Sequence, residues 1–156
     1  MPKGGNVDFR DLENFRNNVE KSLGEKQAEE FIEACAKELA ARLLAKVIKR
    51  TPVGEYPKSS GKKGGTLRRG WTGGKTSSGS AYANSLKVHH FGGTYVIEII
   101  NPVEYASYVE FGHRTRNHEG WVEGHFMLTI SEQEIERNAP KILENKLKKK
   151  LGEVFK

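Results

Sequence analysis

The segment SLKVHHFGGTYVIEII, residues 85–100, contains two runs typical of β-strands with Gly92-Gly93 between them. A glycine pair between two such runs is typical of a two-residue hairpin turn. Counting outward from this turn predicts five cross-strand pairs: Phe91–Thr94, His90–Tyr95, Val88–Ile97, Lys87–Glu98 and Leu86–Ile99. The sequence therefore predicts an antiparallel hairpin on which a small sheet is built.

The two faces of this predicted hairpin differ in polarity. The side expected to face the core carries Leu86, Val88, His90, Tyr95, Ile97 and Ile99. On the other side, Lys87 and Glu98 lie across from each other, and opposite charges at paired positions support the register independently of the apolar pattern.

A long helix is predicted upstream of the hairpin. Apolar residues recur every three or four positions from Ala28 to Val47, which is typical of a helix with a broad buried face. Pro52 ends the pattern because proline cannot continue a helix. Cys35 lies on the apolar face, which favours a buried structural thiol over a nucleophile. A shorter amphipathic stretch, residues 9–23, precedes this helix.

Residues 51–80 supply the positive charge of the chain. They hold six lysines and arginines and one acidic residue. The rest of the sequence has nearly equal numbers of basic and acidic residues, so this segment accounts for most of the net charge of +6. Eight glycines and two prolines leave no helical or strand period here. This composition predicts a long flexible basic loop, in which TLRRGW, residues 66–71, supplies a third strand.

The segment NPVEYASYVEFG, residues 101–112, predicts a short helix with Asn101 as its N-cap, Pro102 in its first turn and Gly112 as its stop. Glu110 is expected on an exposed turn. Residues 113–124 are predicted to form a polar loop. The chain then ends in a helix that Pro140 either bends or divides into two segments.

Two ridges run along the predicted short helix. Tyr105, Tyr108 and Phe111 are spaced three apart and form one ridge, and Ala106 and Val109 form a second ridge beside it. Because a small hairpin cannot cover both, we expect the second ridge to pack inward on the core face of the hairpin. The aromatic ridge then remains partly exposed for a partner. The alternative is that the aromatic ridge itself packs on the core.

The chemistry-bearing residues point away from catalysis. The five histidines offer at most His113 and His118 at a spacing seen in zinc sites, which is a weak signal, so neither metal nor cofactor is expected. The sequence contains no nucleophile elbow and no phosphate-binding loop motif. We therefore expect no enzymatic activity.

Composition limits the number of domains and the cellular compartment that are expected for this chain. A chain of 156 residues with 36% hydrophobic side chains is expected to form one domain, residues 1–156, with a thin core. One cysteine suits a reducing compartment, and neither a membrane span nor an export signal is expected.

Two sequence blocks resemble a family of tailed-bacteriophage minor tail components related to the gene-product-ten tail protein of a lambdoid phage. The central block matches at Asn101, Tyr105, Ala106, Tyr108, Val109, Glu110, Phe111, Gly112, Gly120, Trp121, Val122, Gly124, Phe126, Met127 and Leu128. The upstream block matches at Thr51, Pro52, Val53, Gly65, Leu67, Arg68, Arg69 and Trp71. The chain departs from the family pattern by the insertion GEYPKSSGKKGG at residues 54–65, and by Glu123 where the family often has proline.

The resemblance implies a non-catalytic head–tail connector or tail-completion protein that forms a ring and joins the tail to the capsid. Its expected partners are further copies of itself and neighbouring neck, adaptor or tail-tube proteins. Its expected location is the virion, after assembly in the host cytoplasm. A ring also follows physically when one face of a subunit binds a different face of the next copy and the rotation closes.

These observations together predict an α+β fold in which a small antiparallel sheet, built on the hairpin, is covered on one side by the long helix, the short central helix and the C-terminal helix. The candidate partner interface comprises Tyr105, Tyr108, Phe111, His113, Arg114 and Trp121. The alternative function is DNA binding by residues 58–75, with candidate contacts Lys58, Lys62, Lys63, Arg68, Arg69 and Trp71.

Overall fold

The computed structural model describes residues 4–8, 21, 23–74 and 78–154. Its elements, in order, are β1 (Gly4–Asp8), α2 (Glu25–Arg50), η1 (Lys58–Ser60), α3 (Thr66–Gly70), α4 (Gly79–Ser85), β2 (His89–Phe91), β3 (Thr94–Ile100), α5 (Ala106–Phe111), β4 (Gly112–Arg114), β5 (Trp121–Glu123) and α6 (Met127–Val154). The predicted α+β fold is confirmed. The predicted amphipathic stretch at residues 9–23 lies almost entirely outside the described residues.

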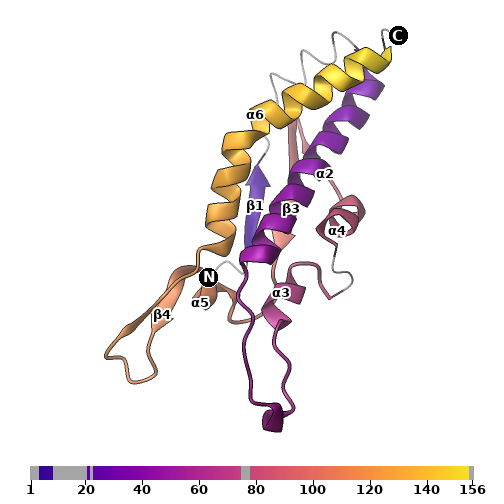
Figure 1. The fold of residues 1–156 in the computed structure, drawn as a ribbon. Coiled ribbons are helices and arrows are strands. Elements are labelled where there is room, and N and C mark those ends of the chain that lie inside the picture. The colour runs from indigo at the N-terminus through magenta and orange to yellow at the C-terminus, as the bar shows by residue number, and fades with distance from the viewer. Residues whose placement is uncertain (1–3, 9–20, 22, 75–77, 155–156) are drawn as a thin grey trace.

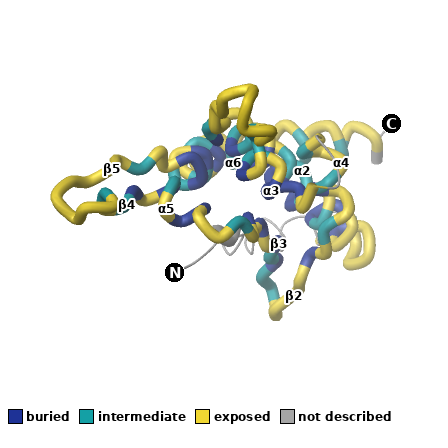
Figure 2. The backbone as a smooth tube through the Cα atoms, turned by 90° about the horizontal axis from the view of Figure 1, so that it is seen from below, coloured by how far each residue is buried: buried dark blue, intermediate teal, exposed yellow. Residues whose placement is uncertain are grey.

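The helices and the main sheet form two layers. α2 and α6 run side by side in opposite directions, and the antiparallel sheet of strand order β1-β3-β2 lies behind them (Figure 1). Seen from below, the helices form one row and β3 and β2 lie on one side of it (Figure 2). As predicted, the long helix and the C-terminal helix cover one side of the sheet, whereas the short helix α5, predicted to share in this cover, packs chiefly on β4 and α6.

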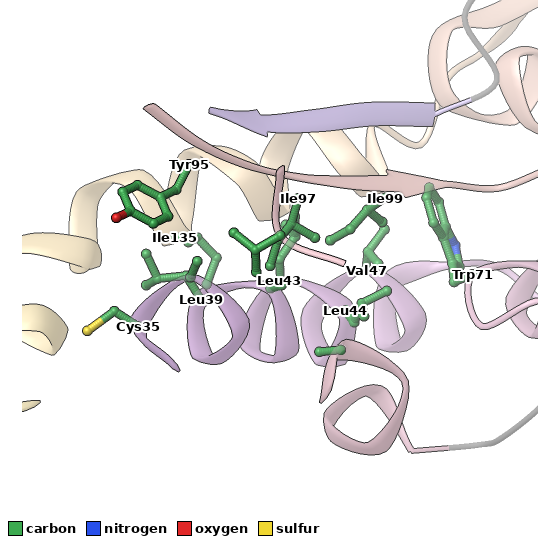
Figure 3. Packing of buried hydrophobic residues seen from close by; sticks show 14 of the residues in the cluster. Cys35, Leu39, Leu43, Leu44, Val47, Trp71, Tyr95, Ile97, Ile99 and Ile135 are labelled. Atoms are coloured by element: carbon green, nitrogen blue, oxygen red, sulfur yellow. The ribbon is translucent and has the colours of Figure 1, made fainter. Parts of the chain in front are cut away.

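The core lies between α2 and β3. Ile97 and Ile99 are fully buried, and their side chains point toward α2, where Leu39, Leu43 and Val47 form the facing surface (Figure 3). Cys35 lies at one end of this contact, and burial raises the pKa of its thiol to about 12. A thiol with such a pKa is protonated and inert at neutral pH, so the prediction of a structural cysteine is confirmed.

The hairpin forms in the predicted register around Gly92-Gly93, but it is shorter than predicted. The pairs Phe91–Thr94 and His90–Tyr95 are present, and the ladder adds His89–Val96 before β2 ends. The pairs predicted beyond this point do not form, because Leu86 instead terminates α4 with an extended backbone. Glu98 pairs with Asn6 of β1 rather than with Lys87.

The third strand is not the one predicted. β1 pairs antiparallel with β3 along its whole length, from Gly4–Ile100 to Asp8–Val96. Residues 66–70, predicted as a strand, form the helix α3 instead. The prediction of a segment without helices over residues 51–80 is also wrong, because η1, α3 and the first two residues of α4 lie within it.

The short helix α3 is fixed to the end of α2. Trp71 is buried, and its indole N–H donates to the hydroxyl of Thr51 at 2.7 Å, while that hydroxyl donates to the carbonyl of Val47 at 2.6 Å. The guanidinium of Arg68 donates twice to the carbonyl of Thr51, at 2.7 and 3.1 Å. The side chains of Thr51 and Arg68 thus donate to two carbonyls at the C-terminal end of α2, and Trp71 holds the Thr51 hydroxyl in place.

Asn101 is not an N-cap, because α5 begins only at Ala106. Its buried amide instead donates to the carbonyl of Leu67 at 2.7 Å and accepts the backbone N–H of Val103 at 3.2 Å. Asn101 thereby joins α3 to the chain that leads into α5. The predicted stop at Gly112 is confirmed, since α5 ends at Phe111 and Gly112 adopts φ +86°.

The C-terminal helix continues through Pro140, which lies inside α6. The helix changes direction partway along its length, so of the two predicted alternatives the chain adopts a bend (Figure 1). Ion pairs hold α6 against α2: Glu134 binds Lys46 at 2.8 Å and also pairs with Arg50. Over the part of the chain that is described, no helix has the length and apolar character of a membrane span.

Candidate interaction surfaces

The short helix α5 separates its two ridges as the sequence predicts. Ala106 is 3% exposed and Val109 packs against the core, whereas Tyr105, Tyr108 and Phe111 are 43%, 51% and 45% exposed. The alternative, in which the aromatic ridge forms the core contact, is wrong. α5 packs chiefly on β4 and α6 rather than on the hairpin of β2 and β3. The prediction that the ridge of Ala106 and Val109 packs on the hairpin is therefore not met.

Glu110 lies inside the protein, contrary to the prediction of an exposed turn. Its carboxylate accepts the backbone N–H groups of Leu128 at 2.9 Å and Thr129 at 2.8 Å, and the hydroxyl of Thr129 at 2.6 Å. These are first-turn N–H groups of α6, which have no helical partner of their own. Glu110 is therefore an N-cap supplied from another helix.

Residues 113–124, predicted as a polar loop, form with Gly112 a two-stranded ribbon instead. Gly112 pairs with Glu123, His113 with Val122 and Arg114 with Trp121. The ribbon projects from the body of the protein beside α5 (Figure 1). At its base the backbones approach closely: a Cβ added to Gly112 would lie 2.5 Å from the carbonyl oxygen of Val122.

The ribbon carries an apolar side chain on each of its faces. Successive pairs in a ladder point to opposite faces, so His113 and Val122 share one face and Arg114 and Trp121 share the other. Val122 is 43% exposed and Trp121 is 56% exposed. Tyr108 meets the ring of His113 edge-on, with 5.7 Å between centroids, which joins the first face to α5.

We call the resulting patch the aromatic surface. It consists of Tyr105, Tyr108, Phe111, His113, Arg114, Trp121, Val122 and Phe126. Phe126 joins it through an edge-on contact with Phe111 at 6.4 Å. All six residues predicted for a partner interface thus lie on or next to α5 and the ribbon, with Arg114 and Trp121 on the ribbon face opposite His113, and Val122 and Phe126 are added to them. Sequence reasoning missed Val122 because the alternation Trp121-Val122-Glu123 is too short to indicate a strand.

A second projection is formed by residues 53–64, which we call the basic finger (Figure 1). Two chain segments, which we call its legs, lead to and from its tip and approach each other closely. A Cβ added to Gly64 in the second leg would lie 1.9 Å from the carbonyl oxygen of Gly54 in the first. The tip contains η1, and its side chains are exposed. The ammonium nitrogen of Lys62 lies 5.9 Å from the ring centroid of Tyr56.

The six predicted basic-loop residues fall into two groups. Lys58, Lys62 and Lys63 are exposed on the basic finger. Arg69 is exposed at its base, where it donates to the carbonyl of Gly64 at 3.2 Å. Arg68 and Trp71 serve the end of α2 instead: Arg68 is half-buried against Thr51 and Trp71 is 1% exposed. A buried indole cannot stack on a base, so the prediction of Trp71 as a nucleic-acid contact is wrong.

A groove of about 1000 Å³ between α2 and α6 is lined mostly by charged side chains. Several of these are engaged in ion pairs, including Lys46 with Glu134, Arg42 with Glu38 and Lys146 with Glu38. The described residues contain no group of three or more histidine, cysteine or acidic side chains arranged to hold a metal ion.

The two projections of the fold carry exposed aromatic and basic side chains, which are suited to contacts with other molecules. The sequence model of the HK97-gp10-like family, described as "Bacteriophage HK97-gp10, putative tail-component", matches residues 13–112, which is more than half of the chain. The chain belongs to this family, and the resemblance found in its motifs is confirmed. No curated protein matches the chain, and no solved structure does.

The family makes the protein a structural tail component of a bacteriophage, with other virion proteins as its partners. The match ends at Gly112, where β4 begins, so it includes α5 and excludes most of the ribbon and α6.

Proposed function

We propose that the protein is a head–tail connector or tail-completion protein that assembles as a ring and joins the tail to the capsid in the virion. The observation that carries the proposal is the exposure of the aromatic surface on a projecting element. Tyr108 and Trp121 each leave about half of the side chain in contact with solvent. Aromatic side chains bounded by charge are what protein interfaces use as anchors.

The ribbon also suits a subunit that has two neighbours. A single flat partner covers only one of its faces, whereas Val122 and Trp121 lie on opposite faces and are both exposed. In a ring, each subunit contacts one neighbour on each side through different surfaces. Insertion of the ribbon between two other protein surfaces would bury both side chains. The partners proposed are further copies of this chain and adjacent neck, adaptor or tail-tube proteins.

The proposal assigns no catalytic step and no cofactor. Two carboxylates in this region have structural partners: Glu110 caps α6, and Glu119 accepts from the amide of Asn117 at 3.0 Å. The proposed role is therefore mechanical, and its energy comes from burial of apolar surface on assembly.

The test replaces Tyr108 or Trp121 by alanine in phage particles assembled in the host. We expect each variant to abolish the joining of tails to capsids while leaving the melting temperature of the purified protein nearly unchanged. Phe91→Ala is the control, because Phe91 is an even more exposed aromatic residue, at 66%, at the end of β2 in a different hairpin. Electron microscopy of lysates counts joined particles and free heads.

Two results would overturn the proposal. The first is normal joining with both variants. The second is a strong loss of stability in the purified variants, which would make the aromatic surface part of the folded core. Particles that join normally when Tyr108 and Trp121 are replaced would instead favour the alternative function, an accessory DNA-binding protein.

A further inference from the structure

The basic finger has a defined shape before any partner binds. Ser60 closes the tip by donating its hydroxyl and its backbone N–H to the carbonyl of Pro57, at 2.7 and 2.9 Å. The backbone N–H of Lys62 donates to the hydroxyl of Ser60 at 3.2 Å. Contact between Gly54 and Gly64 closes the legs. Because the tip is already partly ordered, binding of a partner costs less conformational entropy than binding to an unstructured loop would.

The base of the basic finger is anchored in the core. Arg68 clamps the start of the first leg through the carbonyl of Thr51, and Arg69 holds the end of the second leg through the carbonyl of Gly64. Trp71, directly after α3, is packed inside the protein. Three of the six basic or aromatic residues first assigned to binding thus support the finger and do not form its contact surface.

The exposed chemistry of the basic finger differs from that of the aromatic surface. Lys58, Lys62 and Lys63 lie on it with Glu55 as its one acidic residue, and none of the three ammonium groups is in an ion pair with another described residue. Its apolar side chains are confined to Val53, Tyr56 and Pro57. Protein interfaces have an apolar core from which lysine is depleted. Protein–DNA interfaces are more polar and much more positively charged.

We propose that the basic finger is a binding site for the phosphate backbone of duplex DNA, contacted by Lys58, Lys62 and Lys63. Lysine ammonium groups act as point charges toward phosphate and read no sequence, so binding is independent of base sequence. The inference goes beyond the proposed ring and does not depend on it, because the aromatic surface and the basic finger share no residue.

The experiment measures binding of the purified full chain to a short fluorescent DNA duplex by anisotropy at several salt concentrations. Three phosphate contacts predict a roughly 40-fold loss of affinity between 50 and 200 mM salt. In the variant K58S/K62S/K63S, we expect most of the affinity and this salt dependence to be lost. The control K148S/K149S/K150S removes three lysines from the exposed surface of α6 and is expected to bind almost as tightly as the parent protein.

Each other outcome overturns the inference. Absence of binding by the parent protein at low salt shows that the basic finger does not hold DNA. Equal losses in the two triple variants show that attraction follows net charge and not the finger. Binding of polyglutamate as tightly as the duplex assigns the finger to acidic protein surfaces. Melting temperatures of both variants are measured alongside. We expect them to stay close to that of the parent protein, because none of the three finger lysines pairs with a described acid and the Lys148–Glu144 pair lost in the control is mostly exposed.

Discussion

Glu110 and Thr129 are joined by two hydrogen bonds: one oxygen of the Glu110 carboxylate accepts both the backbone N–H of Thr129, at 2.8 Å, and its hydroxyl, at 2.6 Å. The backbone continues the contact, since the N–H of Phe126 donates to the carbonyl of Glu110 at 3.0 Å and the N–H of His125 to that of Val109 at 2.8 Å. The β4–β5 ribbon lies in sequence between these two attachment points. Its two ends are therefore fixed to each other, and its orientation relative to α5 and α6 follows from Glu110.

Glu110→Ala is expected to lower the free energy of unfolding by about 2–3 kcal/mol, because the variant loses hydrogen bonds to a charged group and leaves first-turn N–H groups of α6 unsatisfied. Denaturant titration followed by circular dichroism measures the change. Glu104→Ala, an exposed carboxylate six positions earlier, is the control and is expected to change stability by less than about 0.5 kcal/mol. Equal effects of the two substitutions would show that the cap is unimportant.

Gly112→Ala is expected to destabilise the protein more than Gly92→Ala. Both glycines have positive φ, +86° and +62°, so both variants strain the backbone, at a cost of about 1–3 kcal/mol. Only at Gly112 does the new Cβ also meet backbone, 2.5 Å from the carbonyl oxygen of Val122, whereas at Gly92 it meets nothing within 4 Å. Thermal unfolding of the two variants compares the costs, and a smaller loss at Gly112 would contradict the close packing at the base of the ribbon.

Trp71 permits a graded test of the anchor between α3 and α2. Trp71→Phe keeps most of the buried ring but removes the N–H that donates to Thr51, and we expect a loss of about 1–2 kcal/mol. Trp71→Ala also removes the ring from the core, for an expected loss of about 3–5 kcal/mol. Chemical denaturation gives both values. An alanine variant as stable as the parent protein would mean that the indole is not buried in solution. Trp71 would then again be a candidate nucleic-acid contact.

The ion pairs of Glu134 predict a stability change in acid. Hydrogen bonds from Arg50, and then from Lys46, lower the pKa of this carboxyl from its ordinary 4.5 to about 2. The unfolded chain takes up the proton near the ordinary pKa and the folded chain only near the lowered one, so acidification through this window favours unfolding. The stabilisation is fully present above pH 4.5 and is lost as the pH falls to about 2.

Melting temperatures recorded from pH 6 to pH 2 test this expectation. In Glu134→Gln the decline across the window should be shallower than in the parent protein. Glu144→Gln is the control, because the pKa of Glu144 is also lowered, through its hydrogen bond with Lys148, but both side chains of that pair are mostly exposed. Parallel curves for the parent protein and Glu134→Gln would show that this ion pair does not contribute.

Local sequence patterns were sufficient to predict the long helix and the cross-strand pairs next to the hairpin turn. The period of apolar residues in α2 indicates both the helix and its buried face, and Pro52 limits its end, because each signal acts within a few residues. The glycine pair at residues 92–93 sets the register of the nearest pairs in the same way. The exposure of Tyr108 was also predictable, since the spacing of α5 residues alone shows that two ridges compete for one buried side.

The tertiary structure decided the features that depend on residues distant in sequence. Gly4–Asp8, GGNVD, has little strand character of its own and becomes a strand because β3 offers it a row of backbone hydrogen-bonding groups. Glu110 becomes a cap only because the first turn of α6 is placed beside it, and Trp71 is buried only because α3 packs on the end of α2, next to Thr51. Sequence determined where helix and hairpin form, because those signals are local. Only the packing of distant segments decided which polar and aromatic side chains are inside, because burial depends on what the rest of the chain brings against them.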